Sequence, residues 1–107
     1  MESILSSIKK LLGITPEYTH FDRDLIIHIN AVFGILHQLG VGPQNGFNIS
    51  GDTEIWNDFM DDGPRLSATE DYIYLKVKQL FDPPTSSAVA ESTKRLCDEM
   101  EWRITNM

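Results

Sequence analysis

A pair of adjacent prolines restricts the fold of this chain more than any other sequence feature. Pro83 and Pro84 lie in the segment QLFDPPTSSAV, residues 79–89, between two stretches whose apolar residues have helical spacing. Proline removes a backbone donor, and it keeps the residue before it, here Asp82, out of the helical conformation. One helix must therefore end here, and the hydroxyl residues that follow can cap the next helix at once. We expect Asp82, Pro83 and Pro84 to form a sharp corner that sets the angle between two helices.

Helical periodicity accounts for most of the chain. Apolar residues recur every three or four positions in five segments, which is typical of helices. In the second segment, Ile26 and Ile35 widen the apolar stripe beyond the single seam that one neighbouring helix would cover. We expect an all-α fold, a small bundle of about five helices in one domain over residues 1–107. The expected helices cover residues 2–12, 22–39, 52–60, 67–81 and about 86–104.

Capping residues indicate where three of these helices should begin. Asp22 and Asp52 precede periodic apolar segments, and an aspartate side chain can accept hydrogen bonds from the free amides of a first helical turn. Ser67 and Glu70 have the spacing of a capping box, in which hydroxyl and carboxylate each bind the other residue's backbone amide. We therefore expect the fourth helix to begin at Ser67.

The apolar stripes define the expected core. Most of its members come from the second and fourth helices. The single cysteine, Cys97, lies on the stripe of the last helix, where a buried structural thiol is more common than a reactive one. The expected core residues are Leu25, Ile29, Val32, Phe33, Leu36, Ile73, Val77, Leu80, Leu96 and Met100.

The segment GVGPQNGFNISG, residues 40–51, has the composition of a loop between the second and third helices. It holds four glycines and the turn-forming pair Asn45-Gly46. Loops of this length in small domains more often serve a function than a mere connection. Phe47 and Ile49 alternate with polar residues, and a bundle of five helices offers them no obvious place. We expect a long glycine-rich loop whose two apolar side chains need a partner surface.

The charge distribution argues against a DNA-binding surface. The formal net charge is −7, and residues 21–63 hold seven acidic residues against the single base Arg23. Affinity for DNA comes largely from lysine and arginine side chains that neutralise phosphates. A solvated acidic face is the simpler interpretation of this region.

No set of residues supports catalysis, a metal site or a cofactor. His28 and His37 are nine residues apart, which places them on opposite sides of one helix. Glu54 and Asp58 would share a helix face, but no base, nucleophile or phosphate-binding loop accompanies them. We expect no enzymatic activity and no cofactor. No apolar stretch reaches the roughly 18 residues of a membrane span, and the first residues are unlike a signal peptide.

Four segments together resemble one family of bacteriophage proteins. They are HINAVFGILHQLGVGP (28–43), GFNISGDTEIWNDF (46–59), YLKVKQLFDPPTSS (74–87) and EMEWRI (99–104). In these segments the chain is similar to the head-tail connector proteins of long-tailed phages and prophages, also called adaptor, head-completion or DNA-packaging proteins. The proline corner and the later EWR form the most specific part of this resemblance.

The resemblance implies a structural role. It implies a helical subunit that assembles as a homo-oligomeric ring below the portal protein, at the neck of the virion. Such a ring extends the DNA channel, closes the filled head and offers a surface to a tail-side connector or stopper protein. Genomic DNA would pass through its lumen without sequence-specific binding, and the subunit would be made in the bacterial host cytoplasm, without a membrane partner. The assembly-interface candidates are Asn45, Phe47, Ile49, Trp56, Ile26 and Ile35, and we expect the loop to become ordered only on assembly.

A second interpretation is a small helical DNA-binding or regulatory protein. The helices on either side of the proline corner would then act as a helix-turn-helix unit. Its positive charges would be Lys76, Lys78, Lys94 and Arg95, but the same helices also carry acidic residues. Tight and steeply salt-dependent binding of duplex DNA would favour this interpretation.

Replacing both corner prolines tests their structural role. In a Pro83→Ala/Pro84→Ala variant, the stop and the backbone restriction are both lost. We expect the fourth helix to run on and the last helix to be misplaced, with a lower free energy of unfolding in urea and loss of assembly. Wild-type stability together with normal assembly would show that the corner does not set the helix angle.

Overall fold

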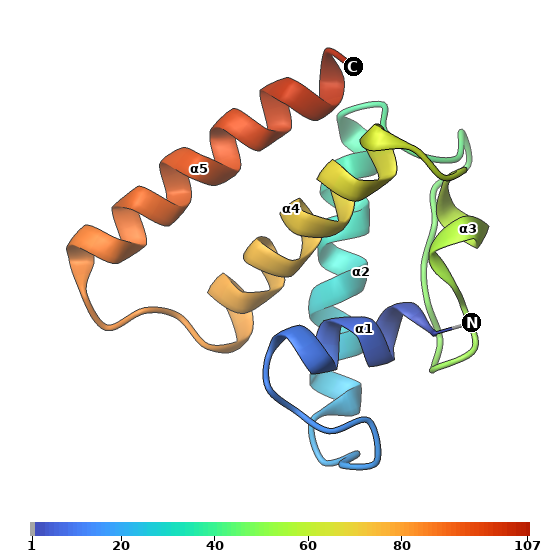
Figure 1. The fold of residues 1–107 in the computed structure, drawn as a ribbon, viewed down its shortest axis with the longest axis vertical. Coiled ribbons are helices and arrows are strands. Elements are labelled where there is room, and N and C mark those ends of the chain that lie inside the picture. Colours follow the sequence, from blue (N-terminus) through green and yellow to red (C-terminus); the bar gives the residue numbers. More distant parts are fainter. Residues whose placement is uncertain (1) are drawn as a thin grey trace.

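The computed structural model describes residues 2–107, which form five helices (Figure 1). In chain order these are α1 (Ile4–Leu11), α2 (Asp22–Gln38), α3 (Trp56–Phe59), α4 (Pro64–Phe81) and α5 (Ser87–Thr105). In this part of the chain the only strand-like pairing is one antiparallel bridge between Ser3 and Ile55. The prediction of an all-α fold with five helices is confirmed.

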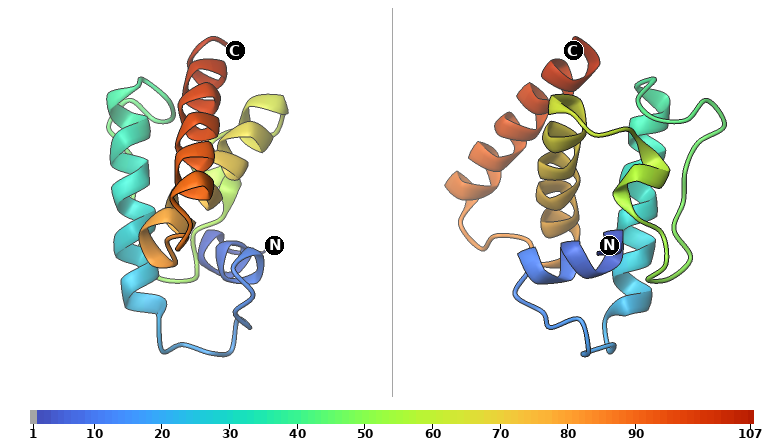
Figure 2. Two further views of the ribbon diagram at one scale, coloured as in Figure 1. Left: turned by 90° about the vertical axis from the view of Figure 1, so that its left-hand side faces the viewer. Right: turned by 45° about the vertical axis from the view of Figure 1, so that its right-hand side comes forward.

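The helix α4 holds the central position. It packs against α2 on one side and against α5 on the other, and α1 contacts α2. Figure 1 places α5 at one side of the molecule and α3 at the opposite side; in the right-hand view of Figure 2, α3 lies in front of α2 and the loop before it forms the outer edge. The molecule measures 35 × 33 × 20 Å along its principal axes. It is therefore a flat body whose two lateral edges are built from different elements.

The helix α4 begins earlier than predicted, at Pro64. Proline is favoured at the first position of a helix because its missing amide has no partner there and its φ already suits the helix. The residue before it, Gly63, has a φ of 149°, a region that glycine adopts at low cost. The predicted start at Ser67 is wrong, and the spacing of Ser67 and Glu70 falls inside the helix.

Neither aspartate predicted as a cap has that role. Asp22 makes no capping hydrogen bond; its Oδ1 lies 2.7 Å from Nζ of the buried Lys9, in an ionic contact rather than a directed hydrogen bond. Lys9 Nζ also donates to the carbonyl of Pro16 at 2.9 Å. These contacts fasten α1 to the start of α2. Asp52 lies outside α3, and Asp58 instead accepts a hydrogen bond from the amide that precedes this helix.

The core lies mainly between α2 and α4. All five predicted core residues of α2 are buried, and so are Ile73 and Val77 of α4. The helix α1 and the segment before α3 add further apolar side chains to it. The buried apolar residues are Ile4, Leu5, Ile8, Leu25, Ile29, Val32, Phe33, Leu36, Val41, Ile49, Phe59, Leu66, Tyr72, Ile73, Val77, Cys97 and Ile104.

Three predicted core positions differ from the structure. Leu80 is 50% exposed and Leu96 is 44% exposed, while Met100 is half-buried. At the end of α4 it is Phe81 that packs inward, with its ring 5.2 Å from the ring of Phe21. The helix α5 is covered by α4 on one face only, so a residue on its flank, such as Leu96, remains accessible.

Cys97 lies at the centre of the face that α5 turns toward α4. The predicted burial of this thiol is confirmed, because only 1% of the residue is exposed. Burial raises the pKa of the Cys97 thiol, and the nearby Lys76 lowers it only in part. The thiol is therefore protonated at neutral pH and contributes to packing as a small apolar group.

Truncation of Phe33 tests the assignment of the core. A Phe33→Ala variant should lose about 3–5 kcal/mol of unfolding free energy, because the side chain is fully buried among other rings. Ile27 lies on the same helix but is 58% exposed, so Ile27→Ala is the matched control and should change stability by less than about 0.5 kcal/mol. Equal losses for the two variants in urea unfolding would contradict this core.

Candidate assembly surfaces

The glycine-rich segment between α2 and α3 is part of the protein's own core. The ring of Phe47 lies 5.0 Å from that of Phe33 and 5.5 Å from that of Phe59, and these two rings are 4.8 Å apart. Ile49 is only 3% exposed. The expectation that Phe47 and Ile49 have no place in the bundle is wrong, because three aromatic rings from α2, the loop and α3 pack together.

The side chain of Asn30 fastens the loop to α2. Its Nδ2 donates to the carbonyl of Ile49 at 2.9 Å, and its Oδ1 accepts from the amide of Ile49 at 2.8 Å. One side chain thus satisfies both backbone groups of a buried residue, which would otherwise be costly. This contact was not predicted from the sequence. The one indication of it there is a polar residue, Asn30, directly after Ile29 in the apolar second helix.

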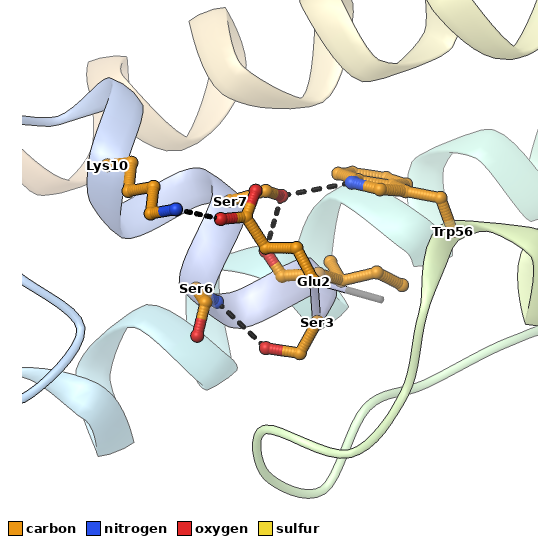
Figure 3. A network of polar contacts seen from close by, with 7 residues as sticks. Glu2, Ser3, Ser6, Ser7, Lys10 and Trp56 are labelled. Carbon is orange, nitrogen blue, oxygen red and sulfur yellow. Dashed lines mark hydrogen bonds and ion pairs between the residues drawn. The ribbon is translucent and has the colours of Figure 1, made fainter.

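The helix α1 holds the same loop from its other end. The amide of Ile4 donates to the carbonyl of Glu54 at 2.8 Å, next to the bridge between Ser3 and Ile55. Figure 3 shows the indole of Trp56 directed at α1, where its Nε1 donates to Ser7 Oγ at 2.9 Å. The start of α3 is therefore fixed against α1 by both backbone and side-chain bonds.

Two further contacts fix the path of the loop. Glu54 Oε2 accepts hydrogen bonds from the amide and the hydroxyl of Ser50, at 2.7 and 3.0 Å. Partial burial tends to raise the pKa of Glu54, but these hydrogen bonds outweigh it and the pKa is lowered. Gly42 has a φ of 97°, and a Cβ there would lie 2.5 Å from the ring of Phe59. This close approach requires glycine.

The predicted interface residues do not form one surface. Asn45 is exposed, whereas Trp56 is partly buried and bonded to α1. Ile26 and Ile35 are both partly exposed. They are nine residues apart on α2, so they lie on opposite sides of that helix, and Ile26 packs against the core. Their contacts with other proteins stay a prediction.

The proline corner has the position that the sequence predicts. The helix α4 ends at Phe81, and Asp82 adopts φ −139° and ψ 70°. The helix α5 begins at Ser87, with Ser86 Oγ accepting from the amide of Val89 at 3.4 Å. Pro83 is exposed, and Pro84 is partly buried between the two helices.

A groove opens between α4 and α5 above this corner, which the sequence did not indicate. It has a volume of about 410 Å³. Its apolar lining comes from Leu75 of α4, Pro84 of the corner and Val89 of α5. Its polar lining comes from Lys78, Gln79, Asp82, Thr85 and Thr93. We call this hollow the hairpin groove.

Two hydrogen bonds join the helices at the end that lies away from the corner. The buried Tyr72 hydroxyl donates to Glu101 Oε2 at 3.0 Å, and Arg65 Nε donates to the carbonyl of Ile104 at 3.2 Å. Burial, and then the bond to Glu101, raises the pKa of Tyr72 far above its ordinary value. The neutral hydroxyl is thus a permanent donor between α4 and α5, while the N-terminal half of α5 leaves the groove open.

The described residues hold no arrangement typical of a metal centre. Among residues 2–107, no three histidine, cysteine or acidic side chains come close enough to hold an ion. Among the same residues, no helix has the length and apolar character needed to cross a membrane.

Removal of the Asn30 side chain tests the attachment of the loop. An Asn30→Ala variant leaves both backbone groups of Ile49 without partners, so we expect a loss of about 1–3 kcal/mol in unfolding free energy. Amide hydrogen exchange at Ile49 should become faster. Asn48 is exposed, so Asn48→Ala is the control and should leave both quantities unchanged. Unaltered exchange at Ile49 in Asn30→Ala would show that the Asn30 side chain does not hold the loop.

Comparison with known proteins agrees with the resemblance seen in the sequence. No curated protein and no solved structure matches the chain significantly. A family model described as phage connector protein matches residues 4–107, which includes all five helices, the loop anchored by Asn30 and the proline corner. The chain is therefore a member of the phage connector protein family.

Proposed function

We propose that this protein is a subunit of a ring that lies below the portal protein of a phage head. The ring would extend the DNA channel, close the filled head and present a surface to a tail-side connector or stopper protein. The observation that carries this proposal is the family match over residues 4–107. The same family membership indicates a location at the neck of the virion.

The shape of the subunit supports a ring. Closed rings need heterologous contacts, in which one face of each subunit meets a different face of the next. The flat body offers two unlike edges, with α5 on one side and α3 with its loops on the other (Figure 1). Phe47 and Ile49 pack in the core, which supports an edge around α3 that keeps its shape in a single subunit.

The charge of the subunit is consistent with a channel for DNA. All of the net charge of −7 belongs to residues 1–73, where eleven acidic residues face four bases; residues 74–107 contain five of each. An acidic wall repels phosphates, so DNA can pass without binding. We infer that part of this acidic surface lines the lumen.

A regulatory DNA-binding protein remains the second candidate. The corner between α4 and α5 would be its helix-turn-helix element, with Lys76, Lys78, Lys94 and Arg95 as contacts to phosphate. Lys94 is already paired with Asp98 at 3.4 Å, and the two helices together have no positive excess in residues 74–107. This balance favours the ring, because duplex binding depends on excess positive charge.

Electron microscopy of the purified protein with its portal tests the ring. We expect negative-stain images with an annular density added to one end of the portal, and no binding of duplex DNA by the free subunit at low salt. Particles that lack this protein should contain DNA but fail to join tails. Unchanged portal images together with tight, salt-dependent DNA binding would contradict the ring and favour the regulatory function.

A further inference from the structure

We propose that the hairpin groove of one subunit receives the segment around α3, residues 55–62, of a second copy of this chain, with Lys78 of the first subunit paired to Asp61 of the second. This contact would be the repeating interface of the ring, so it rests on the proposed function. It specifies which two edges meet and which charges join them.

The groove holds an apolar strip, bordered by polar side chains, that the subunit itself leaves uncovered. Val89, at its mouth, is 53% exposed, and Leu75 forms its wall on α4. The apolar lining continues along α5, since Leu96 and Met100 follow Val89 at spacings of seven and eleven residues, on the same flank of the helix. Leu96 is 44% exposed. Exposed apolar side chains that adjoin a groove in this way are the feature that makes this side of the hairpin a candidate contact surface.

The charges of the chain limit what can cover this stripe. Copies with a net charge of −7 repel one another, so a contact between them is most favourable where an acidic region meets an unpaired base. Lys78 is such a base, since it lines the groove and its Nζ lies near the Tyr74 ring, 5.9 Å from the centroid. Asp82 lines the same groove, but among the described residues it forms no ion pair with Lys78.

The segment around α3 is the acidic partner. Residues 52–62 contain five acidic side chains and no base. Asp58 and Asp62 are engaged within the segment, with the amide of Ile55 and with Asn57. Asp61 is exposed and makes no hydrogen bond or ion pair within residues 2–107. The adjoining Met60 is partly exposed, and a flexible thioether suits an apolar groove.

The positions of the two surfaces permit a ring and exclude a closed pair. The groove lies on the side of α5, and residues 55–62 lie at the opposite side of the body (Figures 1 and 2). One subunit can therefore offer its groove to one neighbour and its α3 segment to another. Such a contact is heterologous and propagates until the ring closes.

A charge exchange tests the pairing. Lys78→Glu and Asp61→Lys should each raise the protein concentration at which rings form by about tenfold, because each places like charges opposite one another. The double variant Lys78→Glu/Asp61→Lys should restore assembly close to that of the wild type. Lys94→Glu is the control, since Lys94 lies on another flank of α5, and it should assemble normally. Normal rings from both single variants, or no recovery in the double variant, would overturn the proposed pairing.

Disulfide trapping gives a second readout that does not depend on ring stability. In a Cys97→Ala background, Lys78→Cys and Asp61→Cys proteins should form a cross-linked dimer only when the two are mixed. A dimer from either protein alone, or none in the mixture, would overturn the pairing.

Different results would contradict the ring and the groove contact. Rings that form on the portal without this cross-link would contradict the groove contact and leave the ring intact. A wild-type protein that forms no ring with its portal would contradict both.

Discussion

The attachment of the glycine-rich loop to α2 is the constraint on which the rest of this structure depends. Ordering a loop costs roughly 1–2 kcal/mol per residue in backbone entropy, and residues 40–51 form no helix or strand that would offset it. The burial of Ile49, the ring contacts of Phe47 and the paired hydrogen bonds from Asn30 supply that compensation. With the loop in place, Glu54 and Trp56 reach α1, and one edge of the subunit acquires a fixed shape.

The helices could be predicted from the sequence because their signals are local. The three-to-four-residue spacing of apolar side chains located all five, and the double proline located the end of α4 correctly at Phe81. The start of α4 was missed because two local signals compete there. Pro64 and Gly63 together begin the helix one turn before the Ser67–Glu70 pattern, and a capping box inside a continuing helix has no free amides to bind.

The candidate surfaces were harder to predict because they depend on residues far apart in the chain. The bond from Asn30 to Ile49 spans nineteen residues, and that from Trp56 to Ser7 spans forty-nine. The spacing of apolar residues within one segment carries no information about contacts between residues so far apart. For the same reason Phe47 and Ile49 looked unpartnered, and the exposure of Leu96 could not be seen before it was known that α5 packs mainly against α4. The corner was foreseen, but the groove above it was not, since its volume depends on how far two helices diverge.

The burial of Cys97 has a consequence for the life of a virion. Under the proposed function, the subunit is made in the reducing interior of a bacterium and the finished particle later meets an oxidising medium, where accessible thiols form disulfides. The only thiol of this chain lies on the face that α5 turns toward α4, and the residue, whose thiol is protonated, is 1% exposed. Both properties slow its oxidation, because the thiolate is the reactive species and an oxidant must reach it. In the proposed ring, neighbouring copies would therefore be held together by non-covalent contacts alone, inside the host cell and outside it.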